Sequence, residues 1–336
     1  MKDNTILDQI GNTPIVRVRH LDTGPCELYL KLENQNPSGS IKDRIALSMI
    51  NAAERAGILQ TGTPIVEATA GNTGLGLALV ASQKGYPLIL VIPDKMSKEK
   101  IVHLQALGAE VILTRSDVNK GHPDYYQDLA AHLASITPHA FHIDQFNNPA
   151  NPYAHETTTA PEIWQQLNQH IDTMIVGVGS GGTLVGLSRF FTRVSPHTEF
   201  IVADPQGSIL ADYINTGKIG TAGHWLVEGI GEDFIPPHFA SATAKAALTI
   251  TDQHSFTAAR ELLRYEGILA GSSSGTLLAA ALRYCRAQKQ AKRVVTFVCD
   301  SGNKYLSKMF DTQWLSDNGI SPTESLFHSP YRLKQN

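Results

Sequence analysis

The chain has 336 residues, of which 42% are hydrophobic and 18% are charged, and its formal net charge is −3. This length exceeds the size at which one hydrophobic core usually keeps growing, so we expect two lobes. The small charge and the scattered basic residues exclude an electrostatic footprint for nucleic acid, and the uncharged runs fall short of the roughly 18 apolar residues of a membrane span. The first residues lack the apolar core of a signal peptide, and Cys26, Cys285 and Cys299 have no metal-ligand spacing, so we expect a cytoplasmic protein without a metal site.

Short β-branched runs alternate with helical patterns along the chain. Strands are expected at residues 28–32, 64–67, 88–92, 110–113, 173–176, 200–203 and 293–298. Helices are expected at residues 41–56, 73–84, 97–107, 124–134, 157–168, 183–193, 255–266 and 274–287. Near-continuous apolar strands fit sheets that are covered on both faces. The alternation therefore predicts an α/β fold with parallel sheets and crossover helices.

The turn-forming stretch 37–44 leads directly into an amphipathic helical pattern. Ser40 and Asp43 have the Ser-x-x-Asp spacing of a helix N-terminus, which places Lys42 in the first turn. The positive end of the helix dipole disfavours a cation there, and shielding from water would further favour the neutral amine. A neutral amine is what a Schiff base with an aldehyde cofactor requires. A surface lysine at an ordinary helix start is the alternative interpretation.

Two glycine-rich loops follow expected strands and precede expected helices. The loop 69–74, TAGNTG, offers backbone amides, Asn72 and two threonines to an anion, although a helix cap without a ligand is the alternative. The loop 177–183, GVGSGGT, has small residues that let the backbone close on a phosphate at a helix N-terminus. Its glycine spacing also matches the dinucleotide fingerprint, with Asp204 at the end of the next strand, which keeps a dinucleotide-binding protein as a rival.

Two further loops are less specific by themselves. The loop 271–275, GSSSG, is typical of a polyserine turn and helix cap, and the glycines in the loop 227–231, VEGIG, indicate a mobile or tightly curved segment. A dinucleotide leaves the loops 37–44, 69–74 and 271–275 without a role. A cofactor with one phosphate, one aldehyde and one pyridine nitrogen uses all of them, and that cofactor is pyridoxal 5′-phosphate.

From about residue 6 to about residue 320, the chain resembles a known protein family. Asn12-Thr13-Pro14 and Ser40-Ile41-Lys42-Asp43-Arg44 are similar to the N-terminal motif and the cofactor-lysine motif of the cysteine synthase and cystathionine β-synthase family. The resemblance implies a two-lobed pyridoxal-phosphate fold of the tryptophan synthase β type, fold type II, in which each lobe is a mostly parallel sheet flanked by helices. It implies a large domain, residues 1–38 plus 147–336, that binds the cofactor phosphate, and a small mobile domain, residues 39–146, that carries the substrate-carboxylate loop.

The same resemblance implies a role for each matching residue. Lys42 would be the catalytic residue and carry the cofactor. The other expected cofactor contacts are Asn72, Gly179, Ser180, Gly181, Gly182, Thr183 and, facing the pyridine nitrogen, Ser273. The expected substrate contacts are Thr69, Ala70, Gly71, Asn72, Thr73, Gln145 and Gly229.

Within the family, the segments 204–210 and 227–236, and Asp300-Ser301 with Tyr305 and Lys308, resemble the cystathionine β-synthase branch. This implies a β-replacement that joins L-serine, or an activated serine, to L-homocysteine through an aminoacrylate. A cysteine synthase that uses O-acetylserine and sulfide is the alternative. A homodimer is also implied. Two departures from the family pattern are Ala70, where serine is usual, and Glu232, where animal members have tyrosine.

Overall fold

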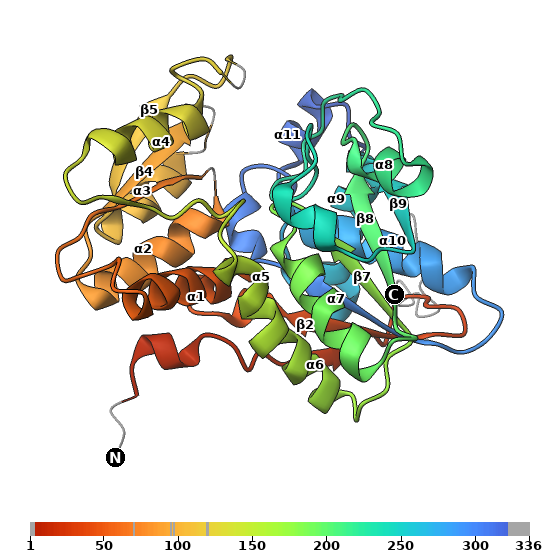
Figure 1. The fold of residues 1–336 in the computed structure, drawn as a ribbon. Coiled ribbons are helices and arrows are strands. Elements are labelled where there is room, and N and C mark those ends of the chain that lie inside the picture. Colours follow the sequence, from red (N-terminus) through yellow and green to blue (C-terminus); the bar gives the residue numbers. More distant parts are fainter. Residues whose placement is uncertain (1–3, 70, 95, 97, 119–120, 322–336) are drawn as a thin grey trace. The chain divides into compact units, whose positions relative to one another are not determined.

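The computed structural model describes residues 4–69, 71–94, 96, 98–118 and 121–321, and Figure 1 shows its helices and strands. The chain divides into two compact units. The first unit contains the residues up to Gly11 and Asn36–His155, and the second contains Asn12–Gln35 and the residues from Glu156 onward. The division expected from the sequence differs from these units in the assignment of residues 1–11, 36–38 and 147–155, and the mobility expected of the small domain stays a prediction.

The first unit is built on a parallel sheet in the order β5-β4-β3-β6. Its strands are β3 (Ile65–Ala68), β4 (Leu88–Pro93), β5 (Glu110–Thr114) and β6 (Phe141–His142). Its helices are α1 (Lys42–Arg55), α2 (Asn72–Lys84), α3 (Lys98–Ala106), α4 (Tyr126–Ile136) and α5 (Ala150–Ala154), with a 3-10 turn at Ile6–Gln9.

Both faces of this sheet are covered because side chains alternate along each strand. Ile65 packs in the apolar core formed with α1 and α2. Val66 and Ala68, its neighbours on the other face, pack with Ala130 of α4. The near-continuous apolar strands of this unit are therefore buried on two sides, as the sequence predicts.

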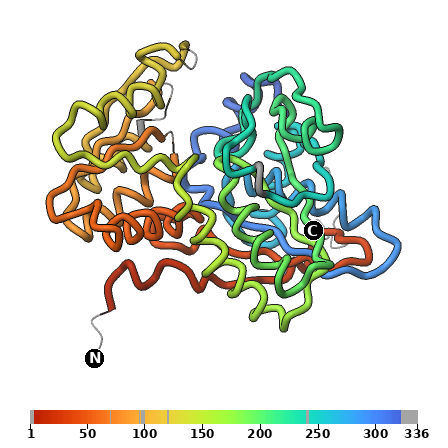
Figure 2. Tube along the Cα trace, in the orientation of Figure 1, coloured from red at the N-terminus to blue at the C-terminus, as the bar shows by residue number. Residues whose placement is uncertain are grey.

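The second unit contains a six-stranded sheet in the order β1-β2-β10-β7-β8-β9. Its strands are β1 (Ile15–Arg17), β2 (Glu27–Leu32), β7 (Thr173–Gly177), β8 (Glu199–Pro205), β9 (Ala246–Ile250) and β10 (Arg293–Val298). Only β1 is antiparallel among the described strands, and the N-terminal strand β2 pairs in parallel with β10, so the red and blue parts of the trace lie side by side (Figure 2).

Helices flank this second sheet. They are α6 (Ala160–Gln166), α7 (Gly182–Val194), α8 (Leu210–Thr216), α9 (Asp252–Glu266), α10 (Ser272–Arg286) and α11 (Thr312–Asp317). Short 3-10 turns lie at Glu33–Gln35, Pro237–Ser241 and Gly302–Tyr305, and a π-helical turn lies at His155–Thr159. In the core, α10 packs along β7, β8 and β10, and α9 packs against α10.

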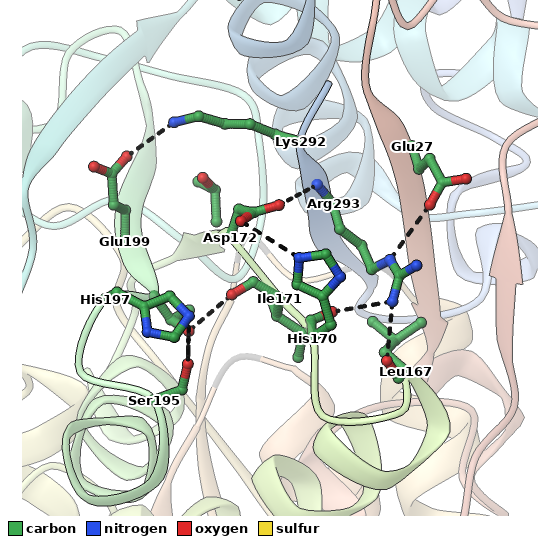
Figure 3. Close-up of polar contacts among 12 residues, drawn as sticks. Glu27, Leu167, His170, Ile171, Asp172, Ser195, His197, Glu199, Lys292 and Arg293 are labelled. Atoms are coloured by element: carbon green, nitrogen blue, oxygen red, sulfur yellow. Dashed lines mark hydrogen bonds and ion pairs between the residues drawn. The ribbon is translucent and has the colours of Figure 1, made fainter. Parts of the chain in front are cut away.

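The amino-terminal ends of β7, β8 and β10 are joined by a network of polar contacts (Figure 3). The Asp172 carboxylate accepts a hydrogen bond of 2.6 Å from the Arg293 amide nitrogen. The Arg293 guanidinium reaches Glu27 at 3.3 Å and the Leu167 carbonyl oxygen at 3.1 Å. The Lys292 ammonium lies 3.5 Å from Glu199. The amino-terminal ends of these strands are thus occupied by internal ion pairs, whereas the glycine-rich loop 177–183 leaves β7 at its carboxyl-terminal end.

The predicted α/β fold with parallel sheets is confirmed, but several element predictions are wrong or incomplete. The strands β1, β6 and β9 and the helices α5, α8 and α11 were not expected. The helix expected at 157–168 begins only at Ala160, after the π-helical turn. No helix in the described part of the chain is long and apolar enough to cross a membrane.

Candidate functional site

Lys42 lies in the first turn of α1, as predicted, but the capping of this helix differs from the expected capping box. The buried Asp43 carboxylate accepts a hydrogen bond of 2.7 Å from the Ser38 amide nitrogen, and the Ser40 hydroxyl accepts one of 3.3 Å from the Lys42 amide nitrogen. The helix begins after Ile41, one residue later than a cap at Ser40 would allow, so Asp43 secures the preceding turn instead. A Cβ at Gly76 would lie 3.0 Å from the Lys42 carbonyl oxygen, so glycine lets α2 approach Lys42 closely.

The expected carboxylate loop joins β3 to α2. Thr69 is buried, and its hydroxyl accepts a hydrogen bond of 3.3 Å from the Gly71 amide nitrogen. Gly71 is the N-cap of α2, which starts at Asn72. The Thr73 hydroxyl donates a hydrogen bond of 2.7 Å to Oε1 of Gln145, so the structure brings the loop and Gln145 together as expected. Ala70 lies outside the described residues.

A buried carboxyl that sequence reasoning did not single out lies directly before this loop. Glu67 is 2% exposed, and its Oε2 accepts a hydrogen bond of 3.3 Å from the Gln145 amide nitrogen. Its Oε1 accepts one of 3.0 Å from the Ala68 amide nitrogen. Burial raises the pKa of Glu67 to about 8. The available signal was a charged residue inside an otherwise apolar strand.

The glycine loop of the second unit follows β7 and ends in the first turn of α7. A Cβ at Gly179 would lie 2.8 Å from the Gly229 carbonyl oxygen, and a Cβ at Gly177 would lie 2.7 Å from the Ile230 side chain. Gly181, the N-cap of α7, has a φ of +86°. Only glycine fits these positions without strain. The first amides of α7, from Gly182 onward, point out of the helix start, where they can bind an anion.

The loop that contains Gly229 is anchored on both sides. The Leu226 and Val227 amide nitrogens donate hydrogen bonds of 3.0 and 3.2 Å to the Asp252 carboxylate. The Gly231 amide nitrogen donates one of 2.9 Å to the Val178 carbonyl oxygen. This loop therefore lies against the glycine loop, and the structure brings Gly229 together with Gly179.

Three consecutive serines begin α10, and their hydroxyls have different partners. The Ser272 hydroxyl accepts a hydrogen bond of 3.0 Å from the Glu228 amide nitrogen, and the Ser274 hydroxyl accepts one of 2.9 Å from the Cys299 amide nitrogen. The Ser273 side chain is also buried, but within the described residues its hydroxyl has no hydrogen-bond partner. Ser273 is thus the serine that can contact a ligand.

Two further residues, Asp300 and Tyr305, lie beside the start of α10. The Tyr305 hydroxyl donates a hydrogen bond of 2.7 Å to the buried Asp300 carboxylate. Burial raises the pKa of Tyr305 well above its usual range. A Cβ at Gly271 would overlap with Asp300, so this glycine allows α10 to start against the end of β10.

Asp204 is the acidic residue on which the alternative interpretation as a dinucleotide-binding protein depends, but its contacts lie within the protein. It is 1% exposed, and its Oδ2 accepts a hydrogen bond of 2.8 Å from the Ala211 amide nitrogen at the start of α8. Burial raises the pKa of Asp204 to about 6. A carboxylate that is enclosed in this way does not face a ribose, which argues against the dinucleotide interpretation.

The residues fit pyridoxal phosphate on three observations of this structure. The second unit has a glycine-rich loop, packed so closely that a Cβ at Gly179 would lie 2.8 Å from the Gly229 carbonyl oxygen, at the start of a 13-residue helix. It also has the buried Ser273 hydroxyl, which has no hydrogen-bond partner among the described residues and suits the pyridine nitrogen. The first unit has a half-buried lysine, Lys42, in the first turn of α1.

Comparison with known proteins agrees with this fit. Residues 6–300 match the family described as pyridoxal-phosphate dependent enzymes. The chain is 41% identical over 318 residues to a cystathionine β-synthase of Apis mellifera, an alignment that covers 94% of this chain and 63% of that protein. It is 35% identical over 333 residues to a cysteine synthase of Dictyostelium discoideum, with 96% and 88% covered.

Solved structures show the same similarity. The crystal structure of an O-acetylserine dependent cystathionine β-synthase from Helicobacter pylori aligns with a TM-score of 0.83 and 37% identity, over 92% of this chain and 98% of that one. The curated cystathionine β-synthases are longer, and this chain spans 58% to 65% of their lengths. Because the family match covers most of the chain and the fold agrees, the chain belongs to the pyridoxal-phosphate dependent enzymes, where it is similar to cystathionine β-synthases and cysteine synthases.

Proposed function

We propose that the chain catalyses a β-replacement that condenses L-serine, or an activated serine, with L-homocysteine to give cystathionine. The observation that supports the proposal is the buried hydroxyl of Ser273, which has no hydrogen-bond partner within the described residues and belongs to the same unit as the glycine loop 177–183. A neutral hydroxyl at the pyridine nitrogen makes the ring a weaker electron sink than a carboxylate would. This favours elimination at Cβ over long-lived carbanions, and therefore replacement over transamination.

Different residues of the chain have different roles in this reaction. Bound pyridoxal phosphate withdraws electrons from the amino acid, which acidifies the Cα proton and allows a leaving group on Cβ to depart. The Lys42 amine would hold the cofactor covalently until the amino group of the substrate displaces it, and the freed amine would then take up the Cα proton and later return it. The first amides of α7 bind the phosphate, and Ser180 and Thr183 add hydroxyls beside it.

The substrate carboxylate is received in the first unit. The loop of Thr69, Gly71, Asn72 and Thr73 offers amide and hydroxyl donors at a helix start, where the dipole favours an anion. The hydrogen bond from Thr73 to Oε1 of Gln145 orients that side-chain amide. Because Oε1 is the accepting atom, the amide presents its Nε2 donor on the other side.

A cysteine synthase that uses O-acetylserine and sulfide remains the second candidate. It is supported by the similarity to a cysteine synthase over 88% of that protein's length, and by the O-acetylserine dependence named for the Helicobacter pylori enzyme. Homocysteine is larger than sulfide, so the two functions differ in the room beyond Cβ. A homodimer stays a prediction, which light scattering of the purified chain tests.

Product analysis distinguishes the two candidates. The purified chain, loaded with pyridoxal phosphate, is given L-serine or O-acetylserine as donor and L-homocysteine or sulfide as acceptor, and the products are identified by mass spectrometry. We expect cystathionine to form with homocysteine more efficiently, by kcat/KM, than cysteine forms with sulfide. Efficient synthesis of cysteine alone would replace the proposal by the second candidate.

Lys42→Ala is the corresponding test of the residue roles. We expect it to lose the covalent cofactor and to lower turnover by about 10²–10⁴-fold, because no other amine takes up the Cα proton. Borohydride reduction followed by peptide mass spectrometry should place the cofactor on Lys42 in the unmodified chain. Lys84→Ala is the matched control, since Lys84 is a lysine of the same unit that pairs with Glu54 at 2.7 Å. A cofactor retained in Lys42→Ala and lost in Lys84→Ala would contradict the assignment.

A further inference from the structure

Glu67 has an unusual environment for a carboxyl group. It lies on β3, an inner strand of its sheet, whose four residues are all buried. Its hydrogen-bond donors are backbone amides, from Ala68, Gln145 and Asp144. Within the described part of the chain, no lysine, arginine or histidine forms an ion pair with Glu67. An anion at this position would be desolvated and without a counter-charge, which is costly.

The position of Glu67 connects two parts of the expected carboxylate site. Along the chain, it precedes Thr69 by two residues. Across the sheet, its Oε2 accepts a hydrogen bond from the Gln145 amide nitrogen, and the Gln145 side chain accepts one from Thr73. The Asn151 side chain donates a hydrogen bond of 2.8 Å to the Gln145 carbonyl oxygen, so Gln145 is held on three sides.

The titratable groups on the surrounding elements are few. The face that Glu67 shares with Ile65 packs against α1 and α2. The charged residues of α1 lie in its first turn (Lys42, Asp43 and Arg44) and its last turn (Glu54 and Arg55). The charged residue of α2 is Lys84, at its end. The other face packs against α4, with Tyr126, Asp128 and His132. The neighbouring strand β4 has no titratable side chain, and β6 brings His142, followed by Asp144. Of these groups, Asp144 acts on Glu67, and its negative charge opposes ionisation.

We propose that Glu67 is a positioning residue of the amino-acid carboxylate site: it fixes Gln145 against Thr73, and it must stay neutral for the substrate carboxylate to bind well. The proposal deepens the function given above and rests on it for the assignment of this loop. In a buried setting, a negative charge two residues before the loop would repel the carboxylate that the loop receives. The raised pKa of Glu67 is consistent with a neutral group at pH 7 and an ionised one above pH 8.

The test measures binding rather than turnover. L-Alanine has the α-carboxylate and no leaving group, and ethylamine is the same molecule without the carboxylate. Both are titrated into the cofactor-loaded chain from pH 6.5 to 9.5, and binding is followed by the change in the cofactor's visible spectrum. We expect the affinity for L-alanine, divided by that for ethylamine, to fall on the order of tenfold as Glu67 ionises.

Two variants separate the charge from the hydrogen bond. Glu67→Gln cannot ionise, and its one oxygen can accept from the Gln145 amide nitrogen although not from the Ala68 amide nitrogen as well, so the ratio should stay constant with pH near its neutral value. Glu67→Leu also cannot ionise but accepts no hydrogen bond, so it should bind L-alanine more weakly than Glu67→Gln at every pH. Glu110→Gln, which neutralises an exposed carboxylate on β5 of the same sheet, should behave like the unmodified chain. In steady-state kinetics, the loss of carboxylate affinity at alkaline pH should raise KM for the amino-acid donor and leave kcat unchanged.

The possible outcomes lead to different conclusions. An alanine-to-ethylamine ratio that does not change with pH in the unmodified chain overturns the proposal, whether or not any variant folds. An alkaline loss that persists in Glu67→Gln also overturns it. Alanine binding needs no replacement chemistry, so the result can be read even if neither cystathionine nor cysteine is formed. A failure of the proposed function alone would therefore appear as normal alanine binding without product.

Discussion

The three serines at the start of α10 show how neighbouring residues of one type differ in their contributions to stability and to ligand binding. The Ser274 hydroxyl is the acceptor for the Cys299 amide nitrogen, whereas the Ser273 hydroxyl has no partner in the described part of the chain. Ser274→Ala should therefore destabilise the chain by about 1–3 kcal/mol, because it leaves a backbone donor unsatisfied. Ser273→Ala should change stability by less than about 0.5 kcal/mol.

Both variants are compared by denaturant unfolding of the cofactor-free chain. The cofactor-loaded forms then supply the functional readout, because Ser273→Ala should alter the visible spectrum of the bound cofactor and lower turnover. Equal losses of stability in the two variants, or an unchanged spectrum in Ser273→Ala, would show that Ser273 does not face the cofactor.

At this scale the sequence predicted some site residues and not others. The position of Lys42 in a first helical turn follows from local spacing, and it is confirmed. The partner of each serine does not follow from spacing, because the donors Glu228 and Cys299 lie 44 and 25 residues away from the serines that they contact. The role of Glu67 also depends on a distant residue, Gln145, which approaches it only through the pairing of β3 with β6.

At the scale of elements, Lys31 joins a strand, a helix and a loop. It is fully buried on β2, and its ammonium donates hydrogen bonds to Glu162 at 2.7 Å, the Thr13 carbonyl oxygen at 2.6 Å and Gln166 at 3.0 Å. Lys31→Met should destabilise the second unit by about 3–5 kcal/mol, because Glu162 on α6 loses its buried cationic partner.

The loss of stability is measured by thermal and denaturant unfolding, followed through a signal that reports on the second unit. The matched control is Arg193→Met, which removes a pair with Glu156 at 2.6 Å in which the arginine side chain is 58% exposed. That change should cost at most about 1 kcal/mol. The double variant Lys31→Met/Glu162→Leu should recover part of the loss, and a lack of recovery would mean that packing rather than charge decides the effect.

The sequence predicted elements best where a periodic pattern is long. The apolar runs of β4 and β10 and the amphipathic pattern of α1 are recovered within one or two residues of their ends. β1 and β6 have three and two residues, too few for a periodicity, and they exist because a neighbouring strand supplies hydrogen-bond partners. The π-helical turn at His155–Thr159 likewise has no local signature in the pattern.

At the scale of the whole molecule, the alternation of strands and helices predicted parallel α/β sheets, and this is confirmed for both units. The exact residues of each unit could not be predicted, because the chain passes between the units near Gly11, Gln35 and His155, inside segments that look continuous in sequence. Contacts far along the chain, such as the pairing of β2 with β10, decide to which unit a segment belongs.

The charged groups of the whole molecule predict how stability depends on pH. Burial raises the pKa of Glu67 to about 8, that of Asp204 to about 6, and also that of Asp252. These groups bind protons more tightly in the folded chain, so stability falls as pH rises from the usual carboxyl pKa through the raised one. Lysine partners lower the pKa values of Glu54 and Glu199, whose contribution is present at neutral pH and is lost as pH falls below about 4.5.

We therefore expect the melting temperature of the cofactor-free chain to be highest near pH 5 and to decline toward pH 8.5. Glu67→Gln should flatten most of this decline, since a shift from 4.5 to about 8 corresponds to about 3–5 kcal/mol. The gain of Glu67→Gln over the unmodified chain should thus grow between pH 5 and pH 8.5, whereas the exposed Glu110→Gln should give a constant difference. Differential scanning calorimetry across this range measures both. Parallel profiles for Glu67→Gln and the unmodified chain would mean that Glu67 has an ordinary pKa in the folded state, and that the alkaline loss of carboxylate binding must arise from another group.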